Sequence, residues 1–394
     1  MIKSLLDMDF YKFTMGYLVF KKHRNVPVKY QFIDRRNIGL ASFIPYQQLL
    51  DEIERIQSMR FSRTEIHYLR GTNEYANRMF DEEYLEFLSN LRLPRIQVTI
   101  GKNADYIFTI EGVWSEAIYW ETLILSTINE LYYKNIMSAM GRLRQEAVWS
   151  QGVLNLLKKA DRIRGNEGLV LCDFGTRRRF SQEWQWHVLG HMKDLPQFKG
   201  TSNTLAALEF GLLPIGTSAH EMYMGMAGIM GKDNLVESHR QTLKEWWDVY
   251  GYGLSIALTD TYTNKFFLQD FTSEQAAAWK GVRHDSGNPI QYGRDVIDFY
   301  KRMGIDPKTK MIVFSDGLTL PVIEQLYTEF SDQIKLSFGW GTDLTNDLGL
   351  PNLQIVIKLC EANGNPVVKL SDNPEKAMGP KELVDHYRKV FTEI

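Results

Sequence analysis

The chain has 394 residues, of which 44% are hydrophobic and 24% charged; this is typical of a soluble globular enzyme and too long for one ordinary core. The net charge of -2 excludes a global attraction to nucleic acid or to anionic membranes, so any anion site must be local. Two cysteines without a CxxC pattern exclude a disulfide scaffold and a cysteine-based zinc site. The first residues lack the apolar core of a secretory signal, and no apolar run reaches the roughly 18 residues of a membrane span, so we expect a cytoplasmic location.

The first third of the chain mixes amphipathic helices with short strands. Residues 4–20 and 81–91 have apolar side chains at helical spacing, whereas residues 26–33 alternate as a half-buried strand does. In chain order the pattern predicts helices at 4–20, 47–59, 64–80 and 81–91, strands at 26–33, 96–100 and 106–111, and a helical tract at 114–157 that is interrupted near 134–135.

From residue 169 strand-like runs alternate with helical segments, and a small or functional cluster follows most of the runs. This alternation predicts parallel βαβ units whose carboxyl ends share one edge. We therefore expect an α/β fold with an irregular (β/α) barrel of about seven strands; periodicity leaves an open doubly wound sheet as the alternative. The predicted strands are 169–174, 212–216, 254–259, 281–283, 311–314, 334–338 and 354–359.

The end of the chain contains a hairpin-type turn at 363–366, a loop with two prolines and a short helix at 381–391. We expect this tail to return to the first domain. The predicted division is an N-terminal α/β domain of residues 1–135, completed by 365–394, and a barrel of residues 136–364 that carries the site.

Common nucleotide, metal and hydrolase motifs are absent from the sequence. No Walker A pattern, GxGxxG fingerprint or GxSxG elbow occurs. His187 and His191 have the spacing of zinc ligands, but the glutamate of HExxH is missing. We therefore do not assign a zinc site to these two histidines, and no metal-ligating residue is predicted.

Residues 169–179 place three consecutive arginines directly after a predicted strand. A strand that ends this way brings fixed positive charge to a sheet edge, where α/β proteins bind anions. The alternative is a solvated basic turn. Two later turns, 315–317 and 339–342, place glycine and hydroxyl groups beyond a strand, where backbone N–H groups can hold a phosphate monoester. For these the alternative is a pair of ordinary tight turns.

Asp260 and Asp285 end separate predicted strands. Carboxylates there can bind sugar hydroxyls, hold Mg²⁺ through water or stabilise a cationic sugar transition state, with structural capping as the alternative. Arg283 would lower the pKa of Asp285 and offers a fork for phosphate or carboxylate. His220, which precedes Glu221 in another strand-end turn, can act as a general base or a phosphoryl acceptor. A histidine merely satisfied by its neighbours is the alternative.

Nine short segments match one known family in order and spacing. They are residues 5–12, 173–181, 200–203, 216–221, 257–260, 283–287, 313–316, 336–342 and 369–372. Together they resemble the nicotinate phosphoribosyltransferase family, which joins nicotinate to 5-phosphoribosyl 1-diphosphate and gives nicotinate mononucleotide and pyrophosphate in the salvage route to NAD. The resemblance implies an irregular α/β barrel packed on a smaller α/β domain built from both chain ends.

The resemblance also implies roles for residues around the base. Phe174 would stack on the pyridine ring, with Tyr11 on the other face. In relatives that tyrosine comes from a neighbouring subunit, so the resemblance allows a homodimer with shared active sites. Arg177 would meet the nicotinate carboxylate and the diphosphate, with the two following arginines left undecided. Ser202 would donate to that carboxylate where the related nicotinamide enzyme has an aspartate, so the acid rather than the amide is the predicted base.

At the sugar end the resemblance makes Asp260 and Asp285 catalytic. Both would face the ribose and its Mg²⁺, where positive charge develops as pyrophosphate leaves, and Arg283 would contact phosphate. His220 matches the histidine that ATP phosphorylates in this family, which makes ATP a co-substrate. The residues implied to hold the 5-phosphate are Gly317, Gly339, Gly341 and Thr342. Two other hypotheses remain at this point: a phosphoribosyl enzyme that uses nicotinamide or quinolinate, and a non-catalytic barrel.

Overall fold

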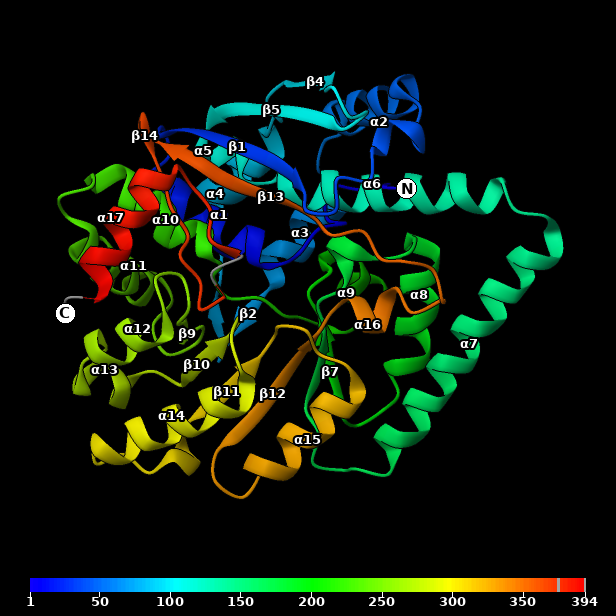
Figure 1. Cartoon of the computed structure of the whole chain (residues 1–394). Helices are drawn as coiled ribbons and strands as arrows, with labels where there is room; N and C mark the ends of the chain where they lie inside the picture. Colours follow the sequence, from blue (N-terminus) through cyan, green and yellow to red (C-terminus); the bar gives the residue numbers. More distant parts are fainter. Residues whose placement is uncertain (374–375, 393–394) are drawn as a thin grey trace.

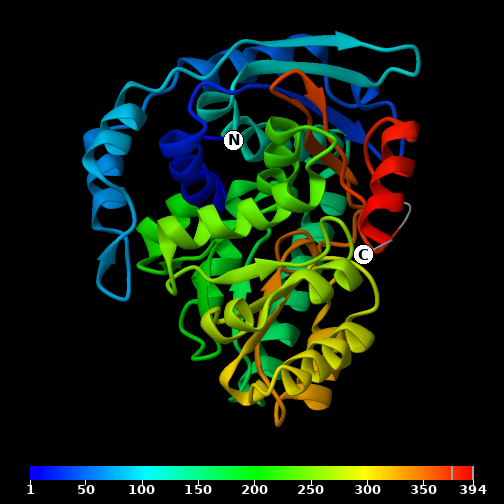
Figure 2. The same ribbon diagram turned by 90° about the vertical axis from the view of Figure 1, so that its left-hand side faces the viewer.

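The computed structural model describes residues 1–373 and 376–392 and contains two main sheets surrounded by helices (Figure 1). One sheet has seven strands, the other has five, and a two-stranded hairpin lies apart from both. The five-stranded sheet lies at the top and the seven-stranded sheet below it, both in Figure 1 and in the rotated view of Figure 2.

The helices are α1 Tyr11–Lys22, α2 Tyr46–Ser58, α3 Arg63–Gly71, α4 Glu82–Asn90, α5 Trp114–Ala117, α6 Trp120–Ser138, α7 Arg142–Arg164, α8 Gln182–Met192, α9 Thr204–Phe210, α10 His220–Met230, α11 Leu235–Tyr250, α12 Asn264–Asp270, α13 Ser273–Ala278, α14 Pro289–Arg302, α15 Leu320–Phe330, α16 Thr342–Thr345 and α17 Lys381–Thr392, with 3-10 turns η1 Leu40–Ser42, η2 Thr176–Arg178 and η3 Pro307–Thr309. The strands are β1 Pro27–Asp34, β2 Asn73–Glu74, β3 Asn77–Arg78, β4 Ile96–Ile100, β5 Tyr106–Val113, β6 Leu171–Asp173, β7 Phe198–Thr201, β8 Leu213–Pro214, β9 Ile256–Leu258, β10 Gly281–His284, β11 Met311–Phe314, β12 Lys335–Trp340, β13 Ile355–Ala362 and β14 Asn365–Pro366.

The seven-stranded sheet has the order β8-β7-β6-β12-β11-β10-β9, and every neighbouring pair in it is parallel. Its short strands β6 and β9 are buried along their whole length, as expected for a sheet covered on both faces. The predicted α/β class is confirmed. Because β8 and β9 are edges, the strands form a half-barrel rather than a closed ring.

One predicted barrel strand belongs to the other sheet. The run at 354–359 forms β13, which pairs antiparallel with β1 and places Leu359 opposite Tyr30. The prediction that this run is a barrel strand is therefore wrong. The parallel sheet instead includes β7 as its seventh strand. This strand was not predicted, because Lys199 and Gly200 interrupt any apolar run. An apolar pattern indicates a strand but not the strand with which it pairs.

The five-stranded sheet joins both ends of the chain in the order β14-β13-β1-β5-β4, with antiparallel pairing throughout. The predicted alternation of β1 is confirmed, since Val28, Tyr30 and Phe32 are buried while Lys29 and Gln31 are exposed. Central β1 thus pairs with the C-terminal strand β13 on one side and with the N-terminal strand β5 on the other.

Three predicted helices differ from the observed ones. Residues 4–10 are not helical, because their backbone groups bond to another part of the chain. The N–H of Phe10 donates to Ser202 O, and backbone N–H groups in the first turn of α9 donate to carbonyl oxygens of this segment. The helix predicted at 64–80 ends at Gly71 and is followed by the β2–β3 hairpin. The break predicted near 134–135 lies instead between α6 and α7, at 139–141.

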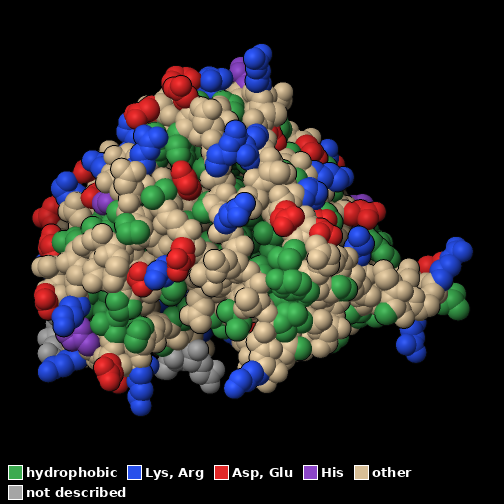
Figure 3. Space-filling model, turned by 90° about the horizontal axis from the view of Figure 1, so that it is seen from above, with side chains coloured by type: hydrophobic (Ala, Val, Ile, Leu, Met, Phe, Trp, Pro, Cys, Tyr) green, Lys and Arg blue, Asp and Glu red, His purple; other side chains and the backbone are tan. Residues whose placement is uncertain are grey.

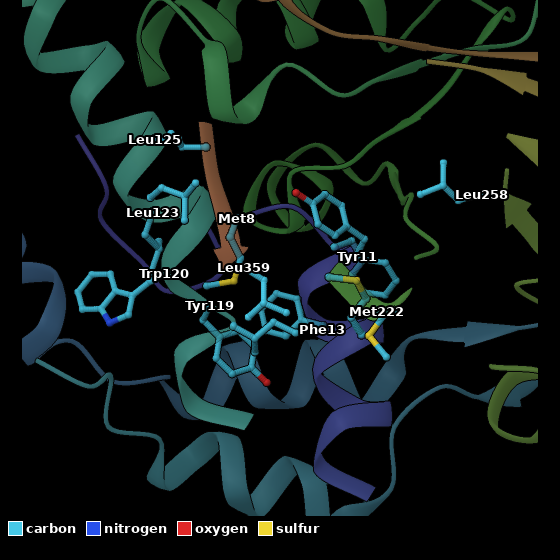
Figure 4. Packing of buried hydrophobic residues seen from close by; sticks show 14 of the residues in the cluster. Met8, Tyr11, Phe13, Tyr119, Trp120, Leu123, Leu125, Met222, Leu258 and Leu359 are labelled. Carbon is cyan, nitrogen blue, oxygen red and sulfur yellow. The ribbon is translucent and has the colours of Figure 1, made fainter. Parts of the chain in front are cut away.

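Buried aromatic and aliphatic side chains fill the space between α1, α6 and β13. Figure 4 shows Met8, Tyr11 and Phe13 close to Tyr119 and Leu359, and all five are at most 4% exposed. Burial of such a side chain contributes about 1.5–3 kcal/mol, so this cluster fixes α1 against α6 and β13. Among the described residues, no helix is both long and apolar enough to cross a membrane. On the face shown in Figure 3, acidic and basic side chains are interspersed.

Candidate active site

A cavity of about 430 Å³ lies at the carboxyl ends of the parallel strands and is closed on one side by β13. It brings together most of the residues singled out in the sequence. The predicted site residues that line it are Tyr11, Phe174, Arg177, His220, Arg283, Asp285, Gly317, Gly339, Gly341 and Thr342.

The turn after β6 is held in place by the buried carboxylate of Asp173. This carboxylate accepts hydrogen bonds from the Gly175 N–H at 2.8 Å, from Thr201 Oγ1 at 2.6 Å and from Gln185 Nε2 at 2.8 Å. Burial raises its pKa to about 6. Gly175 is required here because a Cβ would lie 2.0 Å from the Thr345 hydroxyl oxygen. The turn therefore presents Phe174 to the cavity from a fixed backbone.

The three consecutive arginines have different surroundings. Arg177 and Arg178 line the cavity. Arg179 is fully buried and makes a bidentate ion pair with Asp7, with Nη1 to Oδ1 at 2.6 Å and Nη2 to Oδ2 at 2.8 Å. Arg179 therefore belongs to the contact between the N-terminal segment and the half-barrel, and only the first two arginines face substrate space.

Arg177 is oriented by two carboxylates. Its Nη1 donates to Glu121 Oε1 at 3.1 Å, and its Nε lies 3.3 Å from Asp9 Oδ2. The guanidinium carbon lies 5.6 Å from the centroid of the Tyr11 ring. Burial acts against the charge, but Tyr11 and the two carboxylates outweigh it and raise the pKa of Arg177. The arginine is a permanent cation with a defined orientation at the cavity wall.

Tyr11 and Phe174 line the same cavity and come from the same chain. The buried Tyr11 hydroxyl has no hydrogen-bond partner, and a Cβ on Gly339 would lie 3.2 Å from Phe174 Cδ2. The homodimer with shared active sites stays a prediction, because the structure describes a single chain. One chain places both rings beside Arg177.

His220 is the first residue of α10 and lies among charged groups. Its Nε2 is 2.9 Å from Asp285 Oδ2 and 2.8 Å from Lys369 Nζ, and its Nδ1 is 3.0 Å from Thr261 Oγ1. Burial and the Lys369 charge lower the pKa of His220 to about 4. If Nε2 carries a proton, it donates to Asp285. If Nε2 carries only its lone pair, it accepts from the Lys369 ammonium. Both protonation states of Nε2 therefore have a hydrogen-bond partner.

Two of the predicted site residues do not line the cavity. Ser202 is fully buried, and its hydroxyl donates to Asp9 Oδ1 at 2.6 Å, so the predicted direct contact with the base is not present in this structure. Asp260 is also fully buried and lies behind His220, with its Oδ1 3.7 Å from Nε2. Its Oδ2 accepts from Ser286 at 2.6 Å, whereas Oδ1 has no hydrogen-bond partner.

Several cationic residues that sequence reasoning missed also line the cavity: Arg35, Lys358, Lys369 and Lys376. Lys369 begins one of the matching sequence segments, which was the one available signal, but no role was predicted for it. Lys358 lies on β13, and burial lowers its pKa to about 8. Lys376 pairs with Asp316 at 2.8 Å. These lysines come from the tail of the chain, whose return to this edge could not be located from periodicity.

A magnesium ion is implied by the family resemblance, and part of the donor set fits it. Among the described residues, His220, Asp260 and Asp285 could together hold a metal ion. Mg²⁺ prefers oxygen ligands and is commonly bound by one or two carboxylates together with substrate phosphates. Asp285 meets this requirement because its side chain is 30% exposed and lines the cavity. The enclosed Asp260 instead has the Lys369 ammonium at 3.6 Å.

The fold and the cavity define an α/β enzyme with a strongly cationic site at the carboxyl edge of a parallel half-barrel. The nicotinate phosphoribosyltransferase (NAPRTase) family model matches residues 169–393, and the model of the NAPRTase N-terminal domain matches residues 6–129. The chain belongs to the nicotinate phosphoribosyltransferase family.

Solved structures agree with this assignment over the whole chain. The nicotinate phosphoribosyltransferase from Porphyromonas gingivalis is 30% identical with a TM-score of 0.89, and the match covers 100% of both chains. The enzyme from Vibrio cholerae is 35% identical with a TM-score of 0.89, covering 100% of this chain and 94% of that one. A putative nicotinate phosphoribosyltransferase from Saccharomyces cerevisiae is 28% identical with a TM-score of 0.86, covering 100% and 99%.

Proposed function

We propose that this enzyme joins nicotinate to 5-phosphoribosyl 1-diphosphate and releases nicotinate mononucleotide and pyrophosphate. The observation that carries the proposal is the cavity itself, which is lined by two aromatic rings, by the cations Arg177, Arg283 and Lys369 and by glycine turns. Family membership and the named relatives support the same reaction. We also propose a cytoplasmic location and leave the homodimer as a prediction.

At the base end, the pyridine ring would lie between Tyr11 and Phe174. Its carboxylate would pair with Arg177, which is already held as a cation by Asp9 and Glu121. A guanidinium fork matches a carboxylate in shape and charge, which favours nicotinate over the neutral nicotinamide. Ser202 would support this preference indirectly, through its hydrogen bond to Asp9.

In the transfer step the ring nitrogen donates its lone pair to C1 of the ribose, and the bond from C1 to the diphosphate oxygen breaks. The leaving electron pair goes to pyrophosphate, and no proton has to move. The Asp285 carboxylate would stabilise the ribose as it becomes cationic, and Asp260 would support Asp285 through their shared contacts with His220 and Lys369. When bound, Mg²⁺ neutralises the diphosphate, and Asp285 is the side chain that would hold it.

The cationic wall would receive the phosphates of the sugar substrate. Arg283, Lys358 and Lys369 line the cavity and would pair with the diphosphate as it leaves. Gly317, whose φ of +62° suits glycine, and the turn at 339–342 line the cavity, and their backbone N–H groups would bind the 5-phosphate.

We further propose that His220 accepts a phosphoryl group from ATP. A neutral imidazole is a nucleophile, and the low pKa keeps His220 neutral at physiological pH. The new P–N bond forms as the bond to the leaving ADP breaks, and Lys369 is placed to pair with the phosphoryl oxygens. Hydrolysis of the phosphohistidine would then favour nucleotide synthesis.

The purified protein, incubated with nicotinate, 5-phosphoribosyl 1-diphosphate and Mg²⁺, should release pyrophosphate and form nicotinate mononucleotide. ATP should accelerate this reaction, and His220→Ala should abolish the acceleration while a slower ATP-independent reaction remains. Turnover of nicotinamide at or above that of nicotinate would contradict the proposed substrate. Absence of any product would contradict the enzymatic assignment itself.

A further inference from the structure

Lys12 of α1 is a fully buried lysine that does not line the cavity. Its Nζ lies 2.7 Å from Glu121 Oε2 and 2.6 Å from Glu221 Oε2. Burial acts against its charge, but the two carboxylates outweigh this and raise the pKa of Lys12. Lys12 of α1 is therefore a charged bridge between Glu121 of α6 and Glu221 of α10.

The other oxygen of each carboxylate is also engaged. Glu121 Oε1 accepts from Arg177 Nη1 at 3.1 Å. Glu221 Oε1 accepts from Trp114 Nε1 at 2.9 Å and from the Tyr30 hydroxyl. Each glutamate is thus fixed by Lys12 on one side and by a second donor on the other, and neither can rotate freely.

Glu221 directly follows His220 in the first turn of α10. A continuous series of ion pairs therefore runs from Arg177 through Glu121 and Lys12 to the helix that carries His220. The charges alternate along this series, so displacement of one member changes the field at both neighbours. No other lysine or arginine among the described residues forms ion pairs with both Glu121 and Glu221.

We propose that Lys12 is a positioning residue that couples the state of His220 to the orientation of Arg177, and so to the affinity for nicotinate. The proposal rests on the proposed function. His220 and Glu221 both line the cavity, so a phosphoryl group on His220 adds about -1.5 to -2 charges to the space that the Glu221 carboxylate faces and disfavours that carboxylate. The balance between the ion pairs of Lys12 with Glu221 and with Glu121 then changes. Because Glu121 also accepts a hydrogen bond from Arg177, the orientation of Arg177 changes with it. Coupling of this kind is reciprocal, so nicotinate also changes the affinity for ATP.

The test is the factor by which ATP changes the KM for nicotinate, measured in the whole enzyme. Couplings between sites typically amount to about 5–150-fold. In Lys12→Met, which keeps the length of the side chain without its charge, this factor should fall at least about fivefold towards one. The matched control is Lys21→Met on the same helix, which removes an exposed lysine paired with Asp81 and should retain the full factor.

Lys12→Met leaves two buried carboxylates without their cation, so thermal unfolding is recorded for every variant. If it does not fold, the variant Lys12→Met/Glu221→Gln removes one charge of each sign and serves instead. An unchanged ATP factor in the folded variant overturns the proposal. Wild-type enzyme that makes product from nicotinate without any response to ATP overturns it together with the phosphohistidine, whereas wild-type enzyme without product overturns the proposed function itself.

Discussion

Burial sets the protonation state of His220. Desolvation and the neighbouring Lys369 ammonium lower its pKa to about 4, from 6.5 in an unfolded chain. The unfolded chain therefore binds more protons than the native enzyme between these two values, so this group reduces stability as pH falls below about 6.5 and has no effect above it. The same shift keeps the imidazole neutral, and hence nucleophilic, down to mildly acidic pH.

Lys369→Met should move the pKa of His220 back towards 6.5, because a main cause of its depression is removed. In the wild type, titration of His220 should hardly change the rate of ATP-dependent phosphorylation from about pH 5.5 to 7.5. The variant should lose rate progressively over the acidic half of this range. The titration is followed by NMR of the His220 ring, with Lys376→Met as the control since its ammonium pairs with Asp316. An identical midpoint in Lys369→Met and wild type would refute the assigned cause.

Ser202→Ala removes a hydrogen bond to the buried Asp9, whose pKa burial already raises. Loss of a donor to a buried charged group should lower the free energy of unfolding by about 1–3 kcal/mol, measured by urea denaturation. Because Asp9 also contacts Arg177, the KM for nicotinate should rise by about 3–10-fold with little change in kcat. The matched control is Ser126→Ala on α6, which removes a buried hydroxyl that donates to the Thr122 and Leu123 carbonyls, and it should leave the KM for nicotinate unchanged. Lower stability with an unchanged KM would separate Ser202 from base recognition.

Among the single residues, the location of those that follow strands agrees with the sequence analysis, and their roles stay predictions. Phe174, Arg177 and Asp285 lie at the carboxyl edge because parallel strands bring such positions together. Ser202 also follows a strand, but its side chain points to Asp9, and no pattern specifies side-chain direction at an irregular turn. Lys369 was missed because its position depends on how the tail folds back, which is a long-range event.

At the scale of elements, short-range patterns predicted most strands and helices but not their neighbours. β1 and α17 follow the alternation and amphipathicity of their sequences. β13 reads as an apolar strand in either sheet, and only its pairing with β1 decides between them. The non-helical segment 4–10 has helical spacing, but the backbone contacts with the α9 turn override it.

The non-helical segment 4–10 is held to the half-barrel by the ion pair between Asp7 and Arg179, and both residues are fully buried. Arg179→Met leaves the Asp7 charge uncompensated and should cost about 3–5 kcal/mol of unfolding free energy, measured by urea denaturation. Asp7→Asn/Arg179→Met removes both charges and should regain a substantial part of that loss. A single variant within about 1 kcal/mol of wild type would show that the pair is not important for stability.

At the scale of the whole molecule, one chain supplies the described cavity wall from both sheets. The division into two domains stays a prediction. The sheet pairing of β13 indicates that the tail joins the N-terminal part from residue 355 onward rather than from 365. Chain length and composition could suggest two parts, but not that the same sheet contains both ends of the chain.

A site built from one chain predicts no complementation between inactive variants. When Tyr11→Ala and Asp285→Asn enzymes are mixed after unfolding and refolding together, activity should stay at the level of the separate variants. Dimers with shared sites would instead restore up to about a quarter of wild-type activity, since half of the dimers are mixed and each has one intact site. Refolded wild type is the control for recovery. Restored activity would place Tyr11 in the partner's site.

The position of β1 between β5 and β13 has a consequence for biosynthesis. More than half of the chain separates β5 from β13, so at about 5–20 residues per second roughly 10–50 s pass before the second neighbour of β1 leaves the ribosome. During this interval the nascent chain exposes one edge of β1, with unpaired N–H and C=O groups. One of the first strands to be translated is therefore among the last to be completed, and nascent chains stalled before residue 355 should depend on chaperones.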